Sequence, residues 1–424
     1  MFQTLIDPAF LAEENGGTPV LDLNFAALKS LDSRITFARA SSGTFINSSG
    51  LVETATTNTP RFTHDPVTLA SRGLLIESGR TNLLTYSEAI NNAAWTHVGG
   101  THSANQTTAP SGELTADLFT ENSAASTQHR LLQTPTVASG TTYTVSAFVK
   151  RASGTRQFAV TLTTSTAVAR VYFNLDTGTV GTVVAGSGTI TAYPNGWYRC
   201  TATGVSDGLT GTTFFQLCSG TTSGSETYTG DGTSGLYIWG AQLEAGAFAT
   251  SYIQTTSASA SRSADSAVMT GTNFSSWYNQ SQGTISLIAA QGFTLPSSAF
   301  LRPFDISNSG GTERIGAYTT FTSPDNRAYV QAATGGSVFA EFAPAGALGT
   351  GNFGLAISYS ATAVTAAING NASTSDTTVS AFTPDRLTLG AIVAQSSNSV
   401  FNGTIARFRY FNRALASSVQ ALST

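Results

Sequence analysis

Residues 235–244 read GLYIWGAQLE, and this stretch decides the fold class. Within it, the aliphatic side chains of Leu236 and Ile238 alternate with the rings of Tyr237 and Trp239, which is the two-residue period of a β-strand. Because aliphatic side chains usually take the core face, we expect Leu236 and Ile238 to be buried. The aromatic pair then lies on the opposite face, which we interpret as the wall of a groove.

Similar short runs follow one another along most of the chain, separated by Gly, Asn, Asp or Ser about every 8–12 residues. That spacing is typical of β-sandwiches and barrels, so we predict an all-β protein. Helices are expected only at 8–14, 87–94 and 416–422. The clearest expected strands are 142–150, 157–163, 169–175, 197–203, 213–218, 235–243, 283–289, 352–359, 364–369 and 403–411.

Shifts in composition divide the chain into three parts. Residues 1–82 form an irregular N-terminal region, residues 83–256 a first sandwich, and residues 265–424 a second sandwich. The small, polar stretch 255–264 between the sandwiches is expected to be a linker. The chain contains no heptad repeat, so any homo-oligomer, a trimer included, must form through domain faces.

Charge and hydropathy exclude several classes of function. Only 10% of the residues are charged, the net charge is −4, and no basic run is present, so nucleic-acid binding is not expected. The sequence contains no stretch of about 18 apolar residues, so membrane insertion is not expected. The first residues carry neither the basic nor the long apolar segment of a signal peptide, so we expect none.

The sequence also lacks strong catalytic and metal-binding motifs. Cys200 and Cys218 both lie in apolar runs; they could face each other across a hairpin, but we favour two small buried residues and leave a bond between them open. The four histidines have no metal-binding spacing, and no G-x-S-x-G or P-loop pattern occurs. We therefore predict a protein that is not an enzyme and has no cofactor.

Three groups of stretches carry a resemblance to a known family. The first is 35–46 (ITFARASSGTFI), followed by 50–52 (GLV) and 60–62 (PRF). The second is 72–77 (RGLLIE) with 80–84 (RTNLL), and the third is 235–244 with 249–253 (ATSYI). Together, over about residues 30–260, they resemble phage head-spike and tail-fibre proteins and related proteins of gene transfer agents.

Other stretches resemble known modules. Residues 139–150 (SGTTYTVSAFVK) and 195–200 (NGWYRC) are similar to a carbohydrate-binding module of the jelly-roll type. Residues 401–415 (FNGTIARFRYFNRAL) resemble the last strand and short helix of a concanavalin A-like or laminin-G-like sandwich. The resemblance implies adhesion to a host surface polysaccharide, attachment to other virion proteins through the N-terminal region, and a location on the virion surface after assembly in the bacterial cytoplasm.

Sugar recognition needs rings that stack on a pyranose and neutral groups that hydrogen-bond its hydroxyls. The candidates are Trp95, Tyr193, Trp197, Tyr237, Trp239, Gln242 and Tyr318, with Trp277 and Tyr278 as further possibilities. For each of them, packing in a core is the alternative.

Two other functions remain open. In one, the sandwiches are structural spacers or capsid decoration, and another protein carries the receptor site. In the other, the chain is a polysaccharide depolymerase, whose acids would come from Asp117, Glu121, Asp231 and Glu244. A structural calcium ion could be held by the oxygen-rich turns at 176–178, 231–232 or 305–308.

Overall fold

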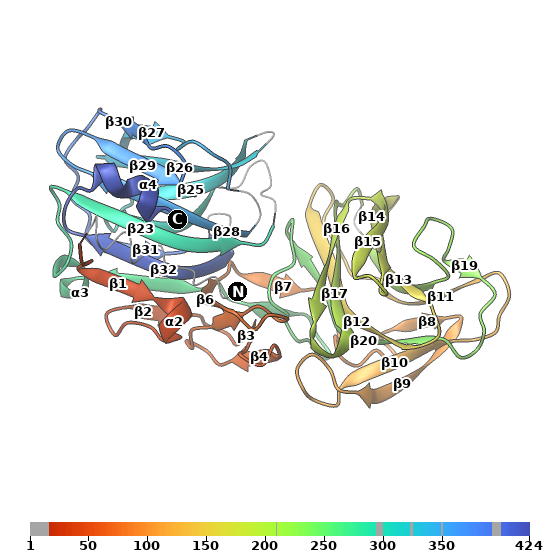
Figure 1. The fold of residues 1–424 in the computed structure, drawn as a ribbon. Coiled ribbons are helices and arrows are strands. Elements are labelled where there is room, and N and C mark those ends of the chain that lie inside the picture. The colour runs from red at the N-terminus through yellow and green to blue at the C-terminus, as the bar shows by residue number, and fades with distance from the viewer. Residues whose placement is uncertain (1–16, 209, 294–299, 323–324, 349–350, 392–399) are drawn as a thin grey trace, which may run out of the picture.

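The computed structural model describes residues 17–208, 210–293, 300–322, 325–348, 351–391 and 400–424. They form two β-sandwiches side by side, which we name the central lobe and the terminal lobe (Figure 1). The central lobe lies within residues 83–256. The terminal lobe contains strands from both ends of the described chain. No helix among the described residues is long and apolar enough to cross a membrane.

The central lobe consists of two antiparallel sheets that enclose one core. The six-stranded sheet has the order β16 (Ser187–Tyr193), β17 (Trp197–Val205), β12 (Thr142–Ser153), β20 (Gly235–Ala245), β10 (Ala116–Glu121) and β9 (Gly100–Thr107). The seven-stranded sheet has the order β15 (Thr179–Ala185), β14 (Ala167–Asn174), β13 (Gln157–Thr163), β18 (Thr212–Cys218), β11 (Thr127–Gln133) and β19 (Thr227–Tyr228), and β8 (Thr96–Val98) also pairs with β11. Leu236 and Ile238 are fully buried in this core, as their alternation predicts.

The terminal lobe is also a two-sheet sandwich. Its eight-stranded sheet has the order β30 (Thr374–Asp376), β29 (Val364–Ile368), β28 (Gly351–Tyr359), β23 (Gly283–Gln291), β32 (Gly403–Phe411), β6 (Ser71–Ile76) and β5 (Phe62–His64), and β1 (Leu21–Asn24) also pairs with β32. Its seven-stranded sheet has the order β2 (Thr36–Ala38), β22 (Ser266–Thr270), β31 (Arg386–Leu389), β24 (Leu301–Ser307), β25 (Arg314–Thr322), β26 (Asp325–Thr334) and β27 (Ser337–Phe342).

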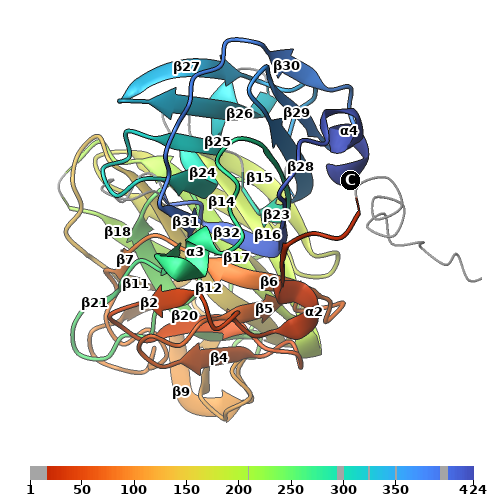
Figure 2. The same cartoon turned by 90° about the vertical axis from the view of Figure 1, so that its left-hand side faces the viewer.

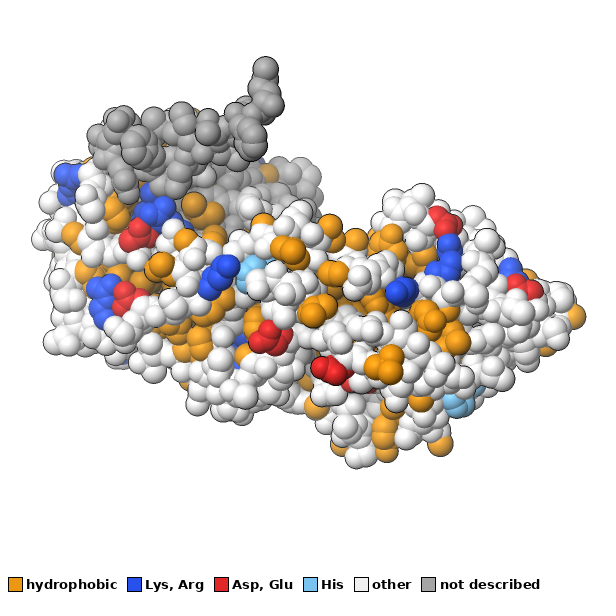
Figure 3. Space-filling model, turned by 60° about the horizontal axis from the view of Figure 1, so that its bottom comes forward, with side chains coloured by type: hydrophobic (Ala, Val, Ile, Leu, Met, Phe, Trp, Pro, Cys, Tyr) orange, Lys and Arg blue, Asp and Glu red, His pale blue; other side chains and the backbone are white. Residues whose placement is uncertain are grey.

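Short elements complete the described structure. Two small sheets pair β3 (Gly43–Ile46) with β4 (Val52–Ala55) and β7 (Arg80–Asn82) with β21 (Ala260–Arg262). The helical segments are α2 (Phe25–Leu28), η1 (Pro194–Gly196), α3 (Thr272–Ser275), η3 (Ala416–Ser418) and α4 (Val419–Leu422). On the face shown in Figure 3, uncharged white surface dominates and charged side chains are scattered, as the low charge content requires.

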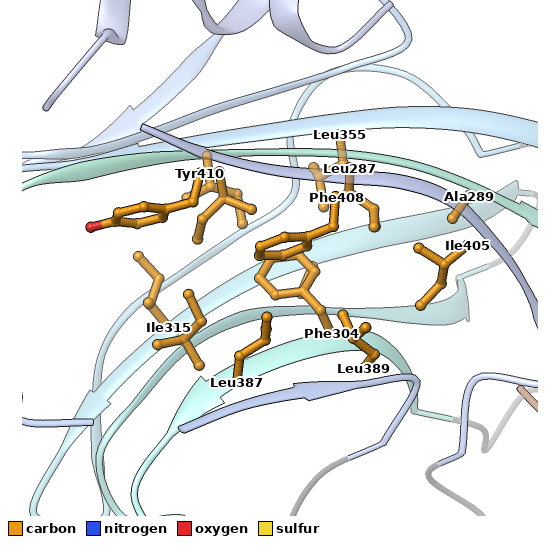
Figure 4. Packing of buried hydrophobic residues seen from close by; sticks show 14 of the residues in the cluster. Leu287, Ala289, Phe304, Ile315, Leu355, Leu387, Leu389, Ile405, Phe408 and Tyr410 are labelled. Carbon is orange, nitrogen blue, oxygen red and sulfur yellow. The ribbon is translucent and has the colours of Figure 1, made fainter. Parts of the chain in front are cut away.

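Aromatic and aliphatic side chains from the two facing sheets fill the core of the terminal lobe. The rings of Phe304 and Phe408 meet edge to face, with their centroids 5.5 Å apart (Figure 4). Leu287 and Leu355 approach from the eight-stranded sheet, and Leu387 approaches from the other sheet. Burial of such side chains is the main stabilising contribution in a sandwich of this kind.

The predicted fold class is confirmed. Each strand predicted above coincides with an observed strand or overlaps most of one, and 416–422 contains η3 and α4. Residues 87–94 form turns without a helix. The expected helix at 8–14 lies outside the described residues.

The N-terminal region is not separate from the sandwiches over its described residues, 17–82. Leu21 to Asn24 pair with β32, Gly403 to Ile405 pair with β6, and β2 pairs with β22. In Figure 2, the orange β6 lies beside the blue β32 of the terminal lobe. The predicted assignment of residues 1–82 and 265–424 to separate parts therefore divides strands that share the same sheets of one lobe. Pairing between strands so far apart along the chain leaves no local signal in the sequence.

The predicted linker at 255–264 is also incorporated into the fold. Ala260–Arg262 pairs with β7, and the side chains of Thr255 and Arg262 are buried. The small polar residues predict a flexible connection, but Arg262 contacts the buried carboxylate of Glu77, which composition does not reveal.

We predict that Leu74→Ala destabilises the terminal lobe by about 2–5 kcal/mol, because Leu74 on β6 is fully buried in its core. Chemical denaturation measures the change. Val67→Ala is the control, since Val67 is exposed in the same region. Equal stability of the two variants would contradict the integration of residues 17–82 into the lobe.

Candidate functional site: the groove between the lobes

The outer face of the six-stranded sheet carries a ladder of hydroxyl groups. Thr203 on β17 lies opposite Ser187 on β16, and Thr201 lies opposite Thr189. These side chains point away from the core, because their neighbours Cys200 and Ala202 are part of it. Ser187, Thr189 and Thr191 are exposed. We name the set Ser187, Thr189, Thr191, Thr201 and Thr203 the hydroxyl ladder.

A hollow of about 850 Å³ lies between this ladder and the terminal lobe. It is lined by β16 and β17, by residues 288–293, 351–352 and 402–406 of the terminal lobe, and by the segments 44–46, 63–66 and 247–252. Its volume falls within the range of about 300–1,000 Å³ that is usual for ligand sites. We name it the inter-lobe groove. In Figure 1, β16 and β17 of the central lobe face the ends of β23 and β28 of the terminal lobe, and residues of all four strands line the groove.

The inter-lobe groove also exposes part of several rings. Phe248, which follows β20, and Phe293, which follows β23, stack with their centroids 3.5 Å apart. Both are half-buried, as are Phe45 and Tyr193, which line the same groove. The guanidinium of Arg80 lies 5.6 Å from the centroid of the Phe248 ring. The groove thus combines aromatic surface with neutral hydrogen-bonding groups.

One cation in the inter-lobe groove is held by neutral partners. Arg199 donates hydrogen bonds to the carbonyl oxygen of Thr250 at 2.8 Å and to Oγ of Ser146 at 3.1 Å. Its guanidinium lies 5.4 Å from the centroid of the Phe148 ring. Within the part of the chain that the structure describes, no salt bridge joins Arg199 to a carboxylate.

A buried ionic cluster lies beside the groove and joins distant segments. Arg61 contacts Glu77 at 2.7 Å and Asp265 at 2.5 Å. Arg39 contacts Asp265 at 3.1 Å, and Arg262 contacts Glu77 at 3.2 Å. All five side chains are buried. We name Arg39, Arg61, Glu77, Arg262 and Asp265 the ionic cluster.

Ser251 connects the ionic cluster to the groove. Its backbone N–H and its hydroxyl each donate a 2.7 Å hydrogen bond to the carboxylate of Glu77. Burial opposes ionisation of Glu77, but the guanidinium groups of Arg262 and Arg61 outweigh it and lower its pKa to about 2. The segment that carries Ser251 therefore has a fixed position in the lining of the groove.

The ionic cluster draws its residues from stretches that were quoted above from the sequence. Stretch 35–46 supplies Arg39, 60–62 supplies Arg61, 72–77 supplies Glu77, and 249–253 supplies Ser251. Residues that are scattered through the sequence thus converge on one buried structure. These stretches therefore contain residues that join the two lobes.

The predicted tryptophan sites are in the core. Trp95, Trp197 and Trp239 are at most 2% exposed, and their indole N–H groups donate to Tyr86, Thr108 and Thr115. Those three bonds are each 3.1 Å long. The prediction that these rings face solvent is therefore wrong.

The strand alternation places Trp239 on the correct face, but that face is covered. The rings of Phe148 and Tyr252 lie 5.3 and 4.7 Å from Trp239, centroid to centroid, in a second small core. Tyr237 packs against the same core and is half-buried. A strand pattern reports which side chains share a face, and it does not report what lies on top of them.

Two further predicted residues, Gln242 and Tyr318, do not line the groove. Gln242 is fully buried, where it donates to Glu244 and accepts from the N–H of Ile253. Tyr318 is 6% exposed and stacks on Tyr329 in the terminal lobe, away from the groove. Of the predicted set, only Tyr193 lines the inter-lobe groove.

The further predicted aromatic pair, Trp277 and Tyr278, packs within the terminal lobe, against its core.

The sequence analysis missed the hydroxyl ladder, Arg199, Phe248 and Phe293. A signal was present, because 187–193 (SGTITAY) and 199–203 (RCTAT) place a hydroxyl at every second position. That alternation could have marked one polar, exposed sheet face.

The carboxylates considered for catalysis do not line the groove. Asp117 accepts from the backbone N–H groups of Asn91 and Asn105. Glu121 and Asp231 do meet, but both contact Arg156, at 2.6 and 3.6 Å. Glu244 is fully buried and accepts hydrogen bonds from Thr250.

Cys200 and Cys218 are buried and not bonded to each other, as we favoured, and they lie on different sheets.

The turns considered for calcium already have protein partners, since Asp176 contacts Arg151 and Asp231 accepts hydrogen bonds from residues 233–234. Asp305 is buried beside Arg302. Among the described residues, no group of three or more His, Cys, Asp or Glu side chains could hold a metal ion.

Comparisons with known proteins add limited information. No protein-family model and no curated protein sequence matches the chain. Among solved structures, the CBM40 of a Ruminococcus gnavus sialidase, bound to α2,3-sialyllactose, matches with 16% identity over 36% of this chain and 88% of its own, at a TM-score of 0.30. Mouse laminin α1 domains LG4–5 match with 12% identity over 80% of this chain and 88% of theirs, at a TM-score of 0.22.

A variant of NanB sialidase from Streptococcus pneumoniae matches with 18% identity over 35% of this chain, at a TM-score of 0.28. That match spans only 24% of the sialidase. At these scores and identities, the matches carry no argument about a ligand. The all-β sandwich class rests on the sheets described above.

We predict that Glu77→Gln lowers the free energy of unfolding by about 3–5 kcal/mol at neutral pH, because Arg61 and Arg262 lose a buried counter-charge. The folded-state pKa of Glu77 is depressed to about 2. Its ionised form therefore stabilises the fold above the ordinary pKa of 4.5, and this contribution is lost as the pH falls toward about 2.

Denaturation of the wild type and the variant between pH 2 and 7 measures this difference, which should narrow on acidification. Asp32→Asn, which removes a partly exposed pair with Arg34, is the control and should cost at most about 1 kcal/mol. A difference that does not depend on pH would contradict the role of the ionised carboxylate.

Proposed function

We propose that the protein is an adhesin on the surface of a phage or phage-like particle, and that its inter-lobe groove binds a host cell-surface polysaccharide. The observation that carries the proposal is the hydroxyl ladder, which lines a groove of about 850 Å³ together with half-buried rings. Neutral hydroxyls can both donate to and accept from sugar hydroxyls. Aromatic rings supply an apolar surface for the face of a pyranose.

The binding of one groove is expected to be weak, because each sugar hydroxyl must give up its water to bind. Several copies on one particle would convert weak sites into firm attachment through effective concentration. We therefore propose that the chain forms a homo-oligomer, which would supply these copies, at the virion surface, the location that the sequence resemblance implies. Attachment to other virion proteins is proposed for the N-terminal region.

The ionisation state of the carboxylates that line the groove favours binding over catalysis. A glycosidase needs one carboxyl group that stays protonated near neutral pH. The groove is lined by Asp65 and Glu77, and each is paired with an arginine. Burial opposes ionisation of Asp65, but hydrogen bonds from the backbone N–H of Thr68 and from Arg72 lower its pKa to about 2. Both groups are therefore ionised and already have partners.

One observation favours the second candidate, a structural spacer. All four tryptophans of the chain are buried, so the strongest stacking residues are unavailable to a sugar. In this case another virion protein carries the receptor site. Particles that lack this chain would then adsorb to host cells normally, whereas the adhesin proposal expects adsorption to fall.

We predict that the purified chain binds host capsule or related surface glycans on an array, and that Thr191→Trp weakens this binding at least tenfold. Thr191 is exposed in the groove, so a large side chain there blocks the ladder. Thr222→Trp, at an exposed turn of the same lobe outside the groove, is the matched control.

Binding that is lost equally in both variants, or retained in both, would place the site elsewhere. No binding by the wild type to any host glycan would remove the adhesin proposal and leave the spacer.

A further inference from the structure

We infer that the polysaccharide recognised by the inter-lobe groove is acidic, and that Arg199 binds its carboxylate groups. This inference rests on the proposed function and adds the chemical class of the ligand. It begins from the balance of charge in the groove.

Each charged side chain that lines the groove forms a salt bridge with a group of opposite charge, with one exception. Asp65 and Arg72 form a pair at 2.5 Å. Glu77 is matched by Arg61 and Arg262 of the ionic cluster. Among the described residues, Arg199 donates hydrogen bonds only to the neutral oxygens of Thr250 and Ser146.

The ionic cluster adds to the positive charge. It contains three guanidinium groups and two carboxylates, so it carries one excess positive charge beside the groove. The neighbouring pair of Arg80 and Glu244, at 3.8 Å, is neutral. The whole chain has a net charge of −4, so the groove is a positive region on a negative protein. Such a region attracts anionic ligands.

The geometry of Arg199 suits a carboxylate. A guanidinium has five N–H donors in a plane and can bind a carboxylate through two parallel hydrogen bonds. One N–H on each terminal nitrogen is used by Thr250 and Ser146, which leaves a second N–H on each. These two contacts and the Phe148 ring hold the side chain in place before the ligand arrives. Little conformational entropy is therefore lost on binding.

The position of Arg199 within the hydroxyl ladder links charge and sugar recognition. Thr191, which is exposed, lies directly opposite Arg199 across β16 and β17. Thr201 and Thr203 follow Arg199 at every second position on the same face. A uronic acid residue bound at Arg199 would thus have the exposed hydroxyls of Ser187, Thr189 and Thr191 nearby for the adjoining sugars of the chain.

The test uses oligomers of galacturonate, mannuronate and hyaluronan, each beside its carboxyl-reduced counterpart, which differs only in the loss of the charge. Titration calorimetry or glycan arrays with the full-length protein compare the two forms. We expect the wild type to prefer at least one acidic oligomer over its reduced form by tenfold or more. We also expect this preference to fall as salt rises, because screening weakens charge attraction.

Two variants of Arg199 separate charge from fold. Arg199→Gln should remove the preference for the acidic form, whereas Arg199→Lys should keep part of it, because the charge remains. Arg130→Gln is the matched control. Arg130 is also half-buried and stacks on a ring, Phe214, at 4.1 Å, but it lies on β11 in the other sheet and outside the groove.

Each outcome decides between the proposals. Equal or tighter binding of the reduced oligomers would overturn the acidic class and leave polysaccharide binding intact. An unchanged preference in Arg199→Gln, or an equal loss in Arg130→Gln, would overturn the role of Arg199. Binding of neutral host glycans only would also overturn the inference, whereas no binding to any glycan would overturn the proposed function itself.

Discussion

The structure depends on a buried network of arginine and carboxylate groups that joins residues 39–77 to residues 262–265. Arg61 lies at its centre, between Glu77 and Asp265. Charges buried in this way cost much free energy unless each one has a partner, so the network tolerates little rearrangement. Because Ser251 hydrogen-bonds to Glu77, the same network sets the position of the groove lining. The inter-lobe groove is therefore a consequence of how the lobes are joined.

The strands and their core faces could be predicted from the sequence because they depend on local alternation. Leu236 and Ile238 are buried as expected, and β13 and β32 begin and end at the predicted residues. The role of β1 and β6 could not be predicted in this way, since their partner, β32, lies more than three hundred residues further along the chain. Pairing of this kind depends on tertiary packing and leaves no local pattern.

The candidate site could be predicted only in part. Alternation placed Trp239 on the face opposite the core, but Phe148 and Tyr252 cover that face. In a sequence, a ring signals a sugar site more strongly than a hydroxyl does, so the sequence predicts Tyr193 and not the adjoining threonines. Arg199 has only neutral hydrogen-bond partners because of the groups that the fold brings next to it. No spacing of residues in the sequence reveals those partners.

Hydrogen exchange measured by mass spectrometry, with and without purified host polysaccharide, would locate the bound ligand. We predict slower exchange at 187–203 of the central lobe, at 249–252, and at 288–293 of the terminal lobe, since these segments line one groove. Slower exchange confined to another face, such as β9 or β27, would contradict it. Protection of only one lobe would likewise show that the ligand does not lie between the two.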